Sequence, residues 1–219
     1  MAKTTAGVVV IGLGRFGTSL ALELLESDTE VLGIDSDAKT VQALSGTLTH
    51  VVEADSTDEE ALRQLSVHEF ERAVIGIGTN LEASILTASV VLGFGVPHVW
   101  AKAISHSHAR ILEQLGVHHV VRPEHDMGRR VAHLVRGRML DYIEFEDGFA
   151  MVRTRPPDVL LGRPLGETHI RREHGVTVVA VKRSNEDFTY ATAETVLESG
   201  DQVIVSGRTR HVERFSELT

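Results

Sequence analysis

The chain has 219 residues, 42% of them hydrophobic, and its 31 acidic residues outnumber its 22 Lys and Arg residues, giving a formal net charge of −9. A negative surface repels phosphate backbones, so we expect no nucleic acid as a partner. The sequence has no cysteine, which excludes disulfides, thiolate nucleophiles and cysteine zinc sites. No apolar run approaches the ~18 residues that span a bilayer, and no signal-peptide core follows Met1, so we expect a cytoplasmic chain.

Six short apolar runs in the first part of the chain predict strands. They are rich in β-branched residues and rarely alternate with polar ones, which is typical of strands buried on both faces of a parallel sheet. The runs span residues 8–11, 31–34, 50–52, 73–77, 98–101 and 118–121.

Residues between these runs show helical spacing. Leu20, Leu24 and Leu25 recur on one helical face after the first run, and Gly116 is placed to end a helix over residues 111–115. Strands that alternate with helices in this way predict an α/β fold. We expect a Rossmann-like doubly wound parallel sheet in a domain of residues 1–123.

The rest of the chain has a different character. Pro123 followed by Glu124 is typical of a helix start, and the apolar spacing beyond it predicts a connecting or crossover helix over residues 124–141. Its apolar stripe exceeds what one domain edge needs, so we expect it to pack against another subunit. Residues 142–219 predict a small α+β domain, with a turn near 144–149, strands at 176–181 and 202–205, and helices near 165–172 and after 208.

A GxGxxG motif lies between the first predicted strand and a predicted helix. It consists of Gly12, Leu13, Gly14, Arg15, Phe16 and Gly17. The first glycine permits a tight turn, the second lets backbone N–H groups approach a pyrophosphate, and the third lets the helix pack against the strand. The helix N-terminus adds about half a positive charge. This context favours a nucleotide site over a turn that merely needs small residues.

Two charged residues narrow the kind of nucleotide. Asp35 ends the second strand, where a carboxylate would accept hydrogen bonds from both ribose hydroxyls and repel a 2′-phosphate, which disfavours NADP. Arg15 is not needed for a dinucleotide, because backbone amides satisfy the pyrophosphate. A guanidinium beside the loop, on this chain or reaching from a neighbouring one, suits an extra terminal phosphate; the alternative is a solvated arginine without a ligand.

Other candidates follow the third and fourth strands. Residues 54–58 lie where an adenine edge would come, although Thr57 or Asp58 would serve equally well as a helix N-cap. Small residues after the fourth strand leave room for a ligand beside the switch point of the sheet. Besides the glycine motif, the candidate cofactor-binding residues are Asp35, Ser36, Ala54, Asp55, Ser56, Thr57, Ile77, Gly78 and Lys102.

These motifs occur in a familiar order with short spacers. Residues 12–17, Asp35, 54–58, 100–103 and 123–128, and residues 162–165 and 198–207 in the tail, carry the likeness. Together they resemble the regulator-of-potassium-conductance (RCK) subunits of bacterial Trk/Ktr-type potassium transporters, over essentially the whole chain.

The resemblance implies a gating ring, commonly an octamer, docked at the cytoplasmic face of a membrane potassium-translocating subunit. It implies an N-terminal domain that binds ATP, ADP or NAD(H), with Arg15 similar to an arginine that senses the γ-phosphate across a subunit boundary. Glu124 matches a residue linked to divalent cations, Mg²⁺ or Ca²⁺. From the residues alone, Glu124 is an acid at a helix start, and a metal there would need further oxygens from phosphate or water.

The resemblance also concerns the C-terminal domain. Some domains of this kind bind cyclic di-AMP at their dimer interface, and the apolar residues near Ile170 and Val178 fall in that region. This chain has Ala191, Thr192 and Ala193 where prolines are frequent in relatives, a departure that argues against this ligand here.

Twelve histidines raise the question of a metal site. His106 and His108 lie at a predicted helix start, and the side chains of His118 and His119 would point apart in a strand, so we expect surface or helix-terminal roles for them. No HExxH or similar ligand set occurs.

Two other function classes compete with a sensor. A nicotinamide-dependent oxidoreductase would need a proton donor beside the nicotinamide and a substrate pocket, and a nucleotide-sensing repressor would need a basic DNA-binding module. The small C-terminal part supplies neither. We therefore predict a nucleotide sensor that is not an enzyme.

Overall fold

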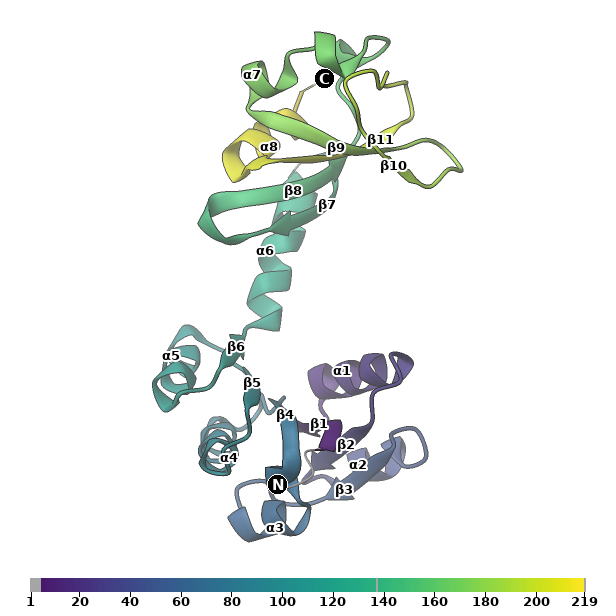
Figure 1. Cartoon of the computed structure of the whole chain (residues 1–219). Coiled ribbons are helices and arrows are strands. Elements are labelled where there is room, and N and C mark those ends of the chain that lie inside the picture. The colour runs from purple at the N-terminus through teal and green to yellow at the C-terminus, as the bar shows by residue number, and fades with distance from the viewer. Residues whose placement is uncertain (1–4, 137, 219) are drawn as a thin grey trace. The chain divides into compact units, whose positions relative to one another are not determined.

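The computed structural model describes residues 5–136 and 138–218. The chain divides into two compact units, Met1–Glu124 and His125–Thr219. No helix in the described ranges combines the length and the hydrophobicity needed to cross a bilayer. Figure 1 shows the elements of both units.

The first unit contains a parallel sheet whose strand order is β3-β2-β1-β4-β5-β6. This order and the helices between the strands confirm the predicted doubly wound α/β fold, with its switch point between β1 and β4. The strands are β1 Thr5–Ile11, β2 Val31–Asp35, β3 His50–Glu53, β4 Phe70–Ile75, β5 His98–Lys102 and β6 His119–Val121. The helices are α1 Arg15–Glu26, α2 Ala38–Leu44, α3 Glu59–Gln64, α4 Leu81–Gly93 and α5 His106–Leu115, with a 3₁₀ turn η1 at Val67–Glu69.

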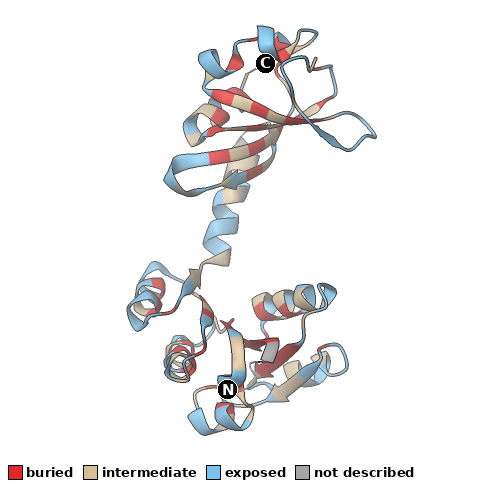
Figure 2. Ribbon diagram, viewed as in Figure 1, coloured by how far each residue is buried: buried red, intermediate tan, exposed pale blue. Residues whose placement is uncertain are grey.

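Both faces of this sheet are buried, as the continuous apolar runs indicated. Val9 and Ile11 point into the core cluster that α3, α4 and α5 cover. Val8 and Val10, which alternate with them, point into a second cluster on the α1 and α2 face. Figure 2 shows the buried residues concentrated in the strands and the exposed residues on the outer helix surfaces.

Side-chain caps fix where most of these helices start. Asp37 accepts hydrogen bonds from Lys39 N and Thr40 N of α2, and Ser105 and Asn80 cap α5 and α4 in the same manner. Gly116, in the left-handed conformation with φ 93°, ends α5 as predicted. By contrast, α1 has Gly14 at its N-cap and therefore no side-chain cap.

The second unit contains an antiparallel sheet with the order β10-β9-β11-β8-β7. Its strands are β7 Met139–Glu144, β8 Phe149–Thr154, β9 Val176–Lys182, β10 Phe188–Tyr190 and β11 Gln202–Arg208. The helices are α6 Pro123–Arg136, α7 Ile170–His174 and α8 Thr209–Ser216, with 3₁₀ turns η2 Glu146–Gly148, η3 Asp158–Leu160 and η4 Leu165–Glu167. A core that includes Val152, Val205 and Phe215 fills one side of the sheet. This is the small α+β domain that the sequence predicted.

The predicted helix over residues 124–141 is too long. The helix α6 ends at Arg136, and Met139–Glu144 forms β7. A bulge between Met139 and Asp141 breaks the alternation of this strand, so the buried residues Met139 and Tyr142 stand three positions apart, as they would in a helix. The division into domains at residues 124 and 142 stays a prediction.

The prediction for His108 needs correction, whereas His118 and His119 are exposed as expected. His108 lies in the first turn of α5 as expected, but it is buried, and burial lowers the pKa of its imidazole. Its Nδ1 accepts a hydrogen bond from Ile104 N. His118 lies just before β6, and its Nδ1 accepts a hydrogen bond from Val99 N of β5. His119 stacks on Trp100, with ring centroids 4.6 Å apart.

Candidate functional site

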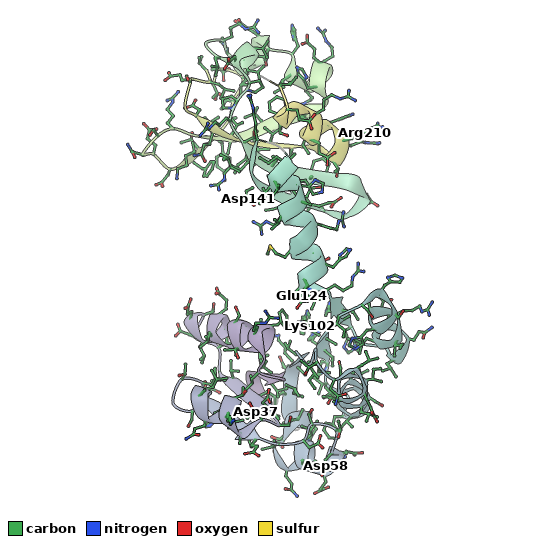
Figure 3. All side chains as sticks on the ribbon, turned by 180° about the vertical axis from the view of Figure 1, so that it is seen from behind. Asp37, Asp58, Lys102, Glu124, Asp141 and Arg210 are labelled. Carbon is green, nitrogen blue, oxygen red and sulfur yellow. The ribbon has the colours of Figure 1, made fainter. Side chains whose placement is uncertain are left out.

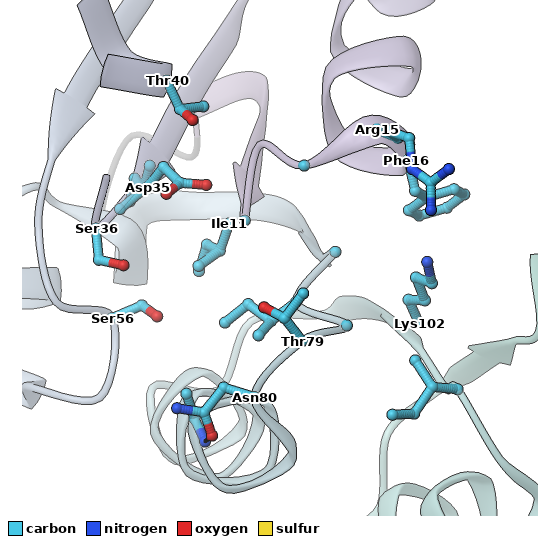
Figure 4. Close-up of a pocket in the computed structure, with 18 of the residues that line it drawn as sticks. Ile11, Arg15, Phe16, Asp35, Ser36, Thr40, Ser56, Thr79, Asn80 and Lys102 are labelled. Carbon is cyan, nitrogen blue, oxygen red and sulfur yellow. Dashed lines mark hydrogen bonds between the residues drawn. The ribbon is translucent and has the colours of Figure 1, made fainter. Parts of the chain in front are cut away.

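A cleft of about 480 Å³ opens at the carboxyl ends of the parallel strands, beside the switch point. The glycine loop between β1 and α1 forms its centre. Much of the remainder is lined by the end of β2, by the segments that follow β3 and β4, and by Lys102, the last residue of β5. Figure 4 shows two chemically different ends: Asp35, Ser36 and Thr40 on one side, and Arg15 and Lys102 on the other.

The backbone of the glycine loop depends on missing side chains. Gly12 has φ +89°, and a Cβ there would lie 2.8 Å from Ile77 Cγ1. A Cβ at Gly17 would lie 2.0 Å from the Gly12 carbonyl oxygen, and one at Gly76 would lie 2.7 Å from the same oxygen. The third glycine of the motif therefore allows the close packing that the sequence predicted. Position 76 has no room for a side chain, because the glycine loop packs directly against it.

The N-terminus of α1 is free to meet a ligand. Gly14 has extended backbone at this N-cap and no side-chain hydrogen bond, and a Cβ on it would meet no atom within 4 Å. The start of α1 thus has no side-chain cap and has open space at Gly14, and a helix N-terminus of this kind suits a phosphate.

Asp35 holds the glycine loop in place. Its Oδ2 accepts a hydrogen bond from Leu13 N at 2.6 Å, and its Oδ1 accepts one from Asp37 N at 2.9 Å. A carboxylate has about four lone-pair positions. Both oxygens can therefore still accept bonds from ribose hydroxyls, and the hydroxyl-bearing Ser36 and Thr40 line the same end of the cleft.

The residues after β3 are engaged within the protein. The Ser56 hydroxyl is buried and lies 2.8 Å from the Thr87 hydroxyl of α4. Asp55 accepts hydrogen bonds from Thr57 N and Thr57 Oγ1, which lower the pKa of its carboxyl. Asp58 accepts bonds from the amides of Glu60 and Ala61, so of the two alternatives left open for it, the helix cap is the one the geometry supports (Figure 3).

An ion pair closes the other end of the cleft. Lys102 Nζ donates a hydrogen bond to Glu124 Oε1 at 2.6 Å, and it also lies 5.8 Å from the centroid of the Phe16 ring. The Lys102 side chain is 11% exposed, whereas that of Glu124 is 64% exposed. The bond from Lys102, helped by the charge of Arg15, lowers the pKa of the Glu124 carboxyl. Figure 3 shows Lys102 and Glu124 side by side.

Most of the predicted site residues line this one cleft. Those that do are Gly12, Gly14, Arg15, Phe16, Asp35, Ser36, Asp55, Ser56, Ile77, Gly78, Lys102 and Glu124. Leu13, Gly17, Ala54 and Thr57 do not line it, although Leu13 and Gly17 fix the loop through the contacts given above. Whether these residues bind a cofactor stays a prediction.

Sequence reasoning gave no ligand role to several other lining residues. They are Ile11, Ile34, Thr40, Ala83 and Ile104, whereas Gly76, Thr79 and Asn80 belong to the segment after β4 that was expected to leave room for a ligand. Thr40 and Ala83 lie in the first turns of α2 and α4, and Asn80 is the N-cap of α4. Helices that follow parallel strands start at the ligand-binding edge of the sheet, and this signal could have identified them.

The described residues place one acidic side chain, that of Glu124, beside Lys102. They contain no group of three His, Asp or Glu side chains placed to hold an ion. Mg²⁺ and Ca²⁺ take about six or more oxygen ligands, and the carboxylate of Glu124 is already bound to Lys102. Further oxygens would have to come from a phosphate, from water or from another molecule.

The second unit has its own cleft in the region noted for cyclic di-AMP. It measures about 460 Å³ and includes Ile170 and Val178. Ala191, Thr192 and Ala193, which stand where relatives have prolines, also line it.

The chain matches two family models and several characterised proteins. The models are the TrkA-N domain, over residues 8–123, and the TrkA-C domain, over residues 149–219. It is 36% identical to the Ktr system potassium uptake protein C of Bacillus subtilis, covering 95% of each chain. It is 35% identical to the Ktr system potassium uptake protein A of Vibrio alginolyticus, covering 90% of each chain.

Solved structures share the fold at lower identity. The GsuK channel bound to NAD matches 95% of this chain with 17% identity and a TM-score of 0.66. The GsuK structure bound to ADP matches 59% of this chain with 18% identity and a TM-score of 0.51. The aligned part is 38% and 35% of those GsuK chains, so this chain spans well under half of their length.

Proposed function

Because the chain belongs to the family of potassium uptake proteins with a TrkA-N and a TrkA-C domain, we propose that it is the nucleotide-binding regulatory subunit of a potassium transporter. The observation that carries this proposal is the cleft beside the glycine loop. There an uncapped helix N-terminus, a carboxylate and two cationic side chains converge on one opening.

Adenine nucleotides with a terminal phosphate suit this cleft best. The ribose would bond to Asp35, the inner phosphates would meet the amides of the glycine loop, and the last phosphate would reach Arg15 and Lys102. We therefore favour ATP and ADP, with NAD(H) as the alternative ligand, since structures of GsuK contain NAD or ADP. Mg²⁺ or Ca²⁺ would accompany the phosphates rather than bind this chain alone.

The nucleotide acts as a signal in this proposal and is not consumed. ATP and ADP must bind two packings of the protein with different affinity, because a ligand that binds both equally shifts nothing. Couplings of this kind are typically ~1–3 kcal/mol. One charge-assisted contact from Arg15 to the last phosphate is worth about 1.5–3 kcal/mol, which is enough to bias the equilibrium.

We also propose that the chain forms a homo-oligomeric ring, an octamer by analogy with the family, on a membrane potassium-translocating subunit at the cytoplasmic side. Support comes from α6, where Met127, Val131 and Val135 are 54%, 45% and 79% exposed. Exposed apolar side chains that recur every four residues on one helix favour burial of that helix face against a second copy of the chain. A monomer in sedimentation at micromolar concentration would contradict this part.

Calorimetric titration of the full-length chain with ATP, ADP, AMP and NADH tests the nucleotide proposal. We expect binding of ATP and ADP with different affinities, and recovery of the nucleotide unchanged by mass spectrometry. Failure of all four to bind would overturn the proposal. Oxidation of NADH by small carbonyl compounds would replace it with the oxidoreductase alternative.

A further inference from the structure

We infer that Glu124 competes with the terminal phosphate of the nucleotide for Lys102, so that phosphate binding releases Glu124 from its ion pair. This inference rests on the proposed nucleotide site and adds a regulatory contact to it. It gives Glu124 a role that needs no metal ion.

Lys102 is confined where the phosphates would end. Its Nζ lies over the Phe16 ring and donates to Glu124. A Cβ on Gly78 would lie only 3.4 Å from the same nitrogen. With a side chain 11% exposed, Lys102 has few other positions. The Lys102 ammonium can donate three hydrogen bonds, and one of them goes to the Glu124 carboxylate. Arg15 lines the same cleft, so this carboxylate occupies a donor that a phosphate would otherwise use.

Glu124 is the partner that can leave. Its side chain is 64% exposed, so water can solvate the carboxylate once the ion pair opens. A triphosphate carries more negative charge than one carboxylate, and it would both attract Lys102 and repel Glu124. The competition should therefore grow with the number of phosphates.

Release of Glu124 from Lys102 would affect the start of α6. Glu124 is the second residue of α6, which starts at Pro123, and an acid in the first turn is stabilised by the helix dipole. The ion pair to Lys102 ties this first turn to the end of β5. Release of Glu124 would remove that tie, and the number of phosphates on the nucleotide would thereby set how firmly the start of α6 is held.

The test is calorimetry on the full-length chain in EDTA, which removes metal ions as an explanation. ATP, ADP and AMP are titrated into the wild type, Glu124→Gln, Lys102→Met and the double variant. Asp126→Asn is the matched control, since it removes a carboxylate two positions further along α6 that does not line the cleft.

We expect Glu124→Gln to tighten ATP binding by about 3- to 10-fold, the range of a partly exposed charged contact. ADP should gain less, AMP should not change, and Asp126→Asn should resemble the wild type. In the Lys102→Met background the gain should vanish, because the two side chains act through one contact.

Unchanged or weaker ATP binding by Glu124→Gln in EDTA would overturn the inference. A gain of equal size in the Lys102→Met background would also overturn it, since it would show direct repulsion of phosphate by Glu124. If the wild type binds none of the three nucleotides, the proposed function itself is wrong, which distinguishes the two failures. Unfolding temperatures of all variants check that each one folds.

Discussion

The two ends of the cleft hold their polar groups in different ways. At one end, Asp35 is bonded to two backbone amides, and Ser56 nearby is bonded to Thr87. At the other end, Lys102 is bonded to Glu124, an exposed carboxylate that can move away. The first end is fixed before any ligand arrives, and it suits the ribose that all adenine nucleotides share. The second end is adjustable, and it suits the phosphates in which they differ.

The largest expected effect comes from the loop that joins both ends. Gly17→Ala places a Cβ 2.0 Å from the Gly12 carbonyl oxygen, so the loop or α1 must shift. We expect the free energy of unfolding to fall by about 3 kcal/mol or more and binding of every nucleotide to be lost. Denaturant unfolding and calorimetry measure the two effects. Gly93→Ala is the control, because a Cβ there meets no atom within 4 Å.

Asp35→Asn tests the fixed end. The asparagine side chain lacks the negative charge that would bond the ribose. Its NH₂ group would also face one of the two backbone N–H groups that donate to Asp35 in the wild type. We expect ATP and ADP to bind about 10- to 100-fold more weakly and by equal factors. Glu53→Gln, on the neighbouring strand and outside the cleft, is the control. Unchanged affinity in calorimetry would remove Asp35 from the site.

Arg15→Ala tests the adjustable end. We expect ATP to lose about 10-fold more affinity than ADP, since the guanidinium is assigned to the last phosphate. Arg110→Ala on the exposed side of α5 should change neither affinity. Equal losses for ATP and ADP would show that Arg15 does not distinguish them, and the contrast between the two ends would disappear.

Asp58→Ala should give the smallest effect of the four substitutions. It tests whether the residues that bind the ribose end of the nucleotide extend as far as Asp58. Because Asp58 caps α3 and does not line the cleft, we expect a loss of about 0.5–2 kcal/mol in the free energy of unfolding. Nucleotide affinity should stay the same. A weaker affinity without a loss of stability would mean that Asp58 contacts the ligand after all.

The sequence predicted much of the first unit because its signals are local. Each buried strand is a continuous apolar run, and Gly12, Gly14 and Gly17 stand at the spacing that a turn and a helix start require. The ion pair between Lys102 and Glu124 was not predicted, because it joins residues 22 positions apart whose meeting depends on the sheet. Thr40 was not predicted for the same reason, since it reaches the cleft from a helix that starts at its rim.

The second unit was harder to predict. The bulge in β7 gives Met139 and Tyr142 a helical spacing, which hid the end of α6. The strand β10, Phe188–Tyr190, has three residues, all exposed, and a run this short is too weak a pattern to predict a strand. Such short edge strands form because they pair with β9, a contact that local sequence does not encode.

The stacking of Trp100 on His119 makes part of the sheet observable with light. The chain has one tryptophan, and it lies two positions before Lys102, so both side chains are on the same face of β5. Indole emission depends on the charge and polarity around the ring. The protein thus has its own fluorophore within two residues of the cationic end of the cleft, and its emission gives a label-free test of whether a phosphate binds there.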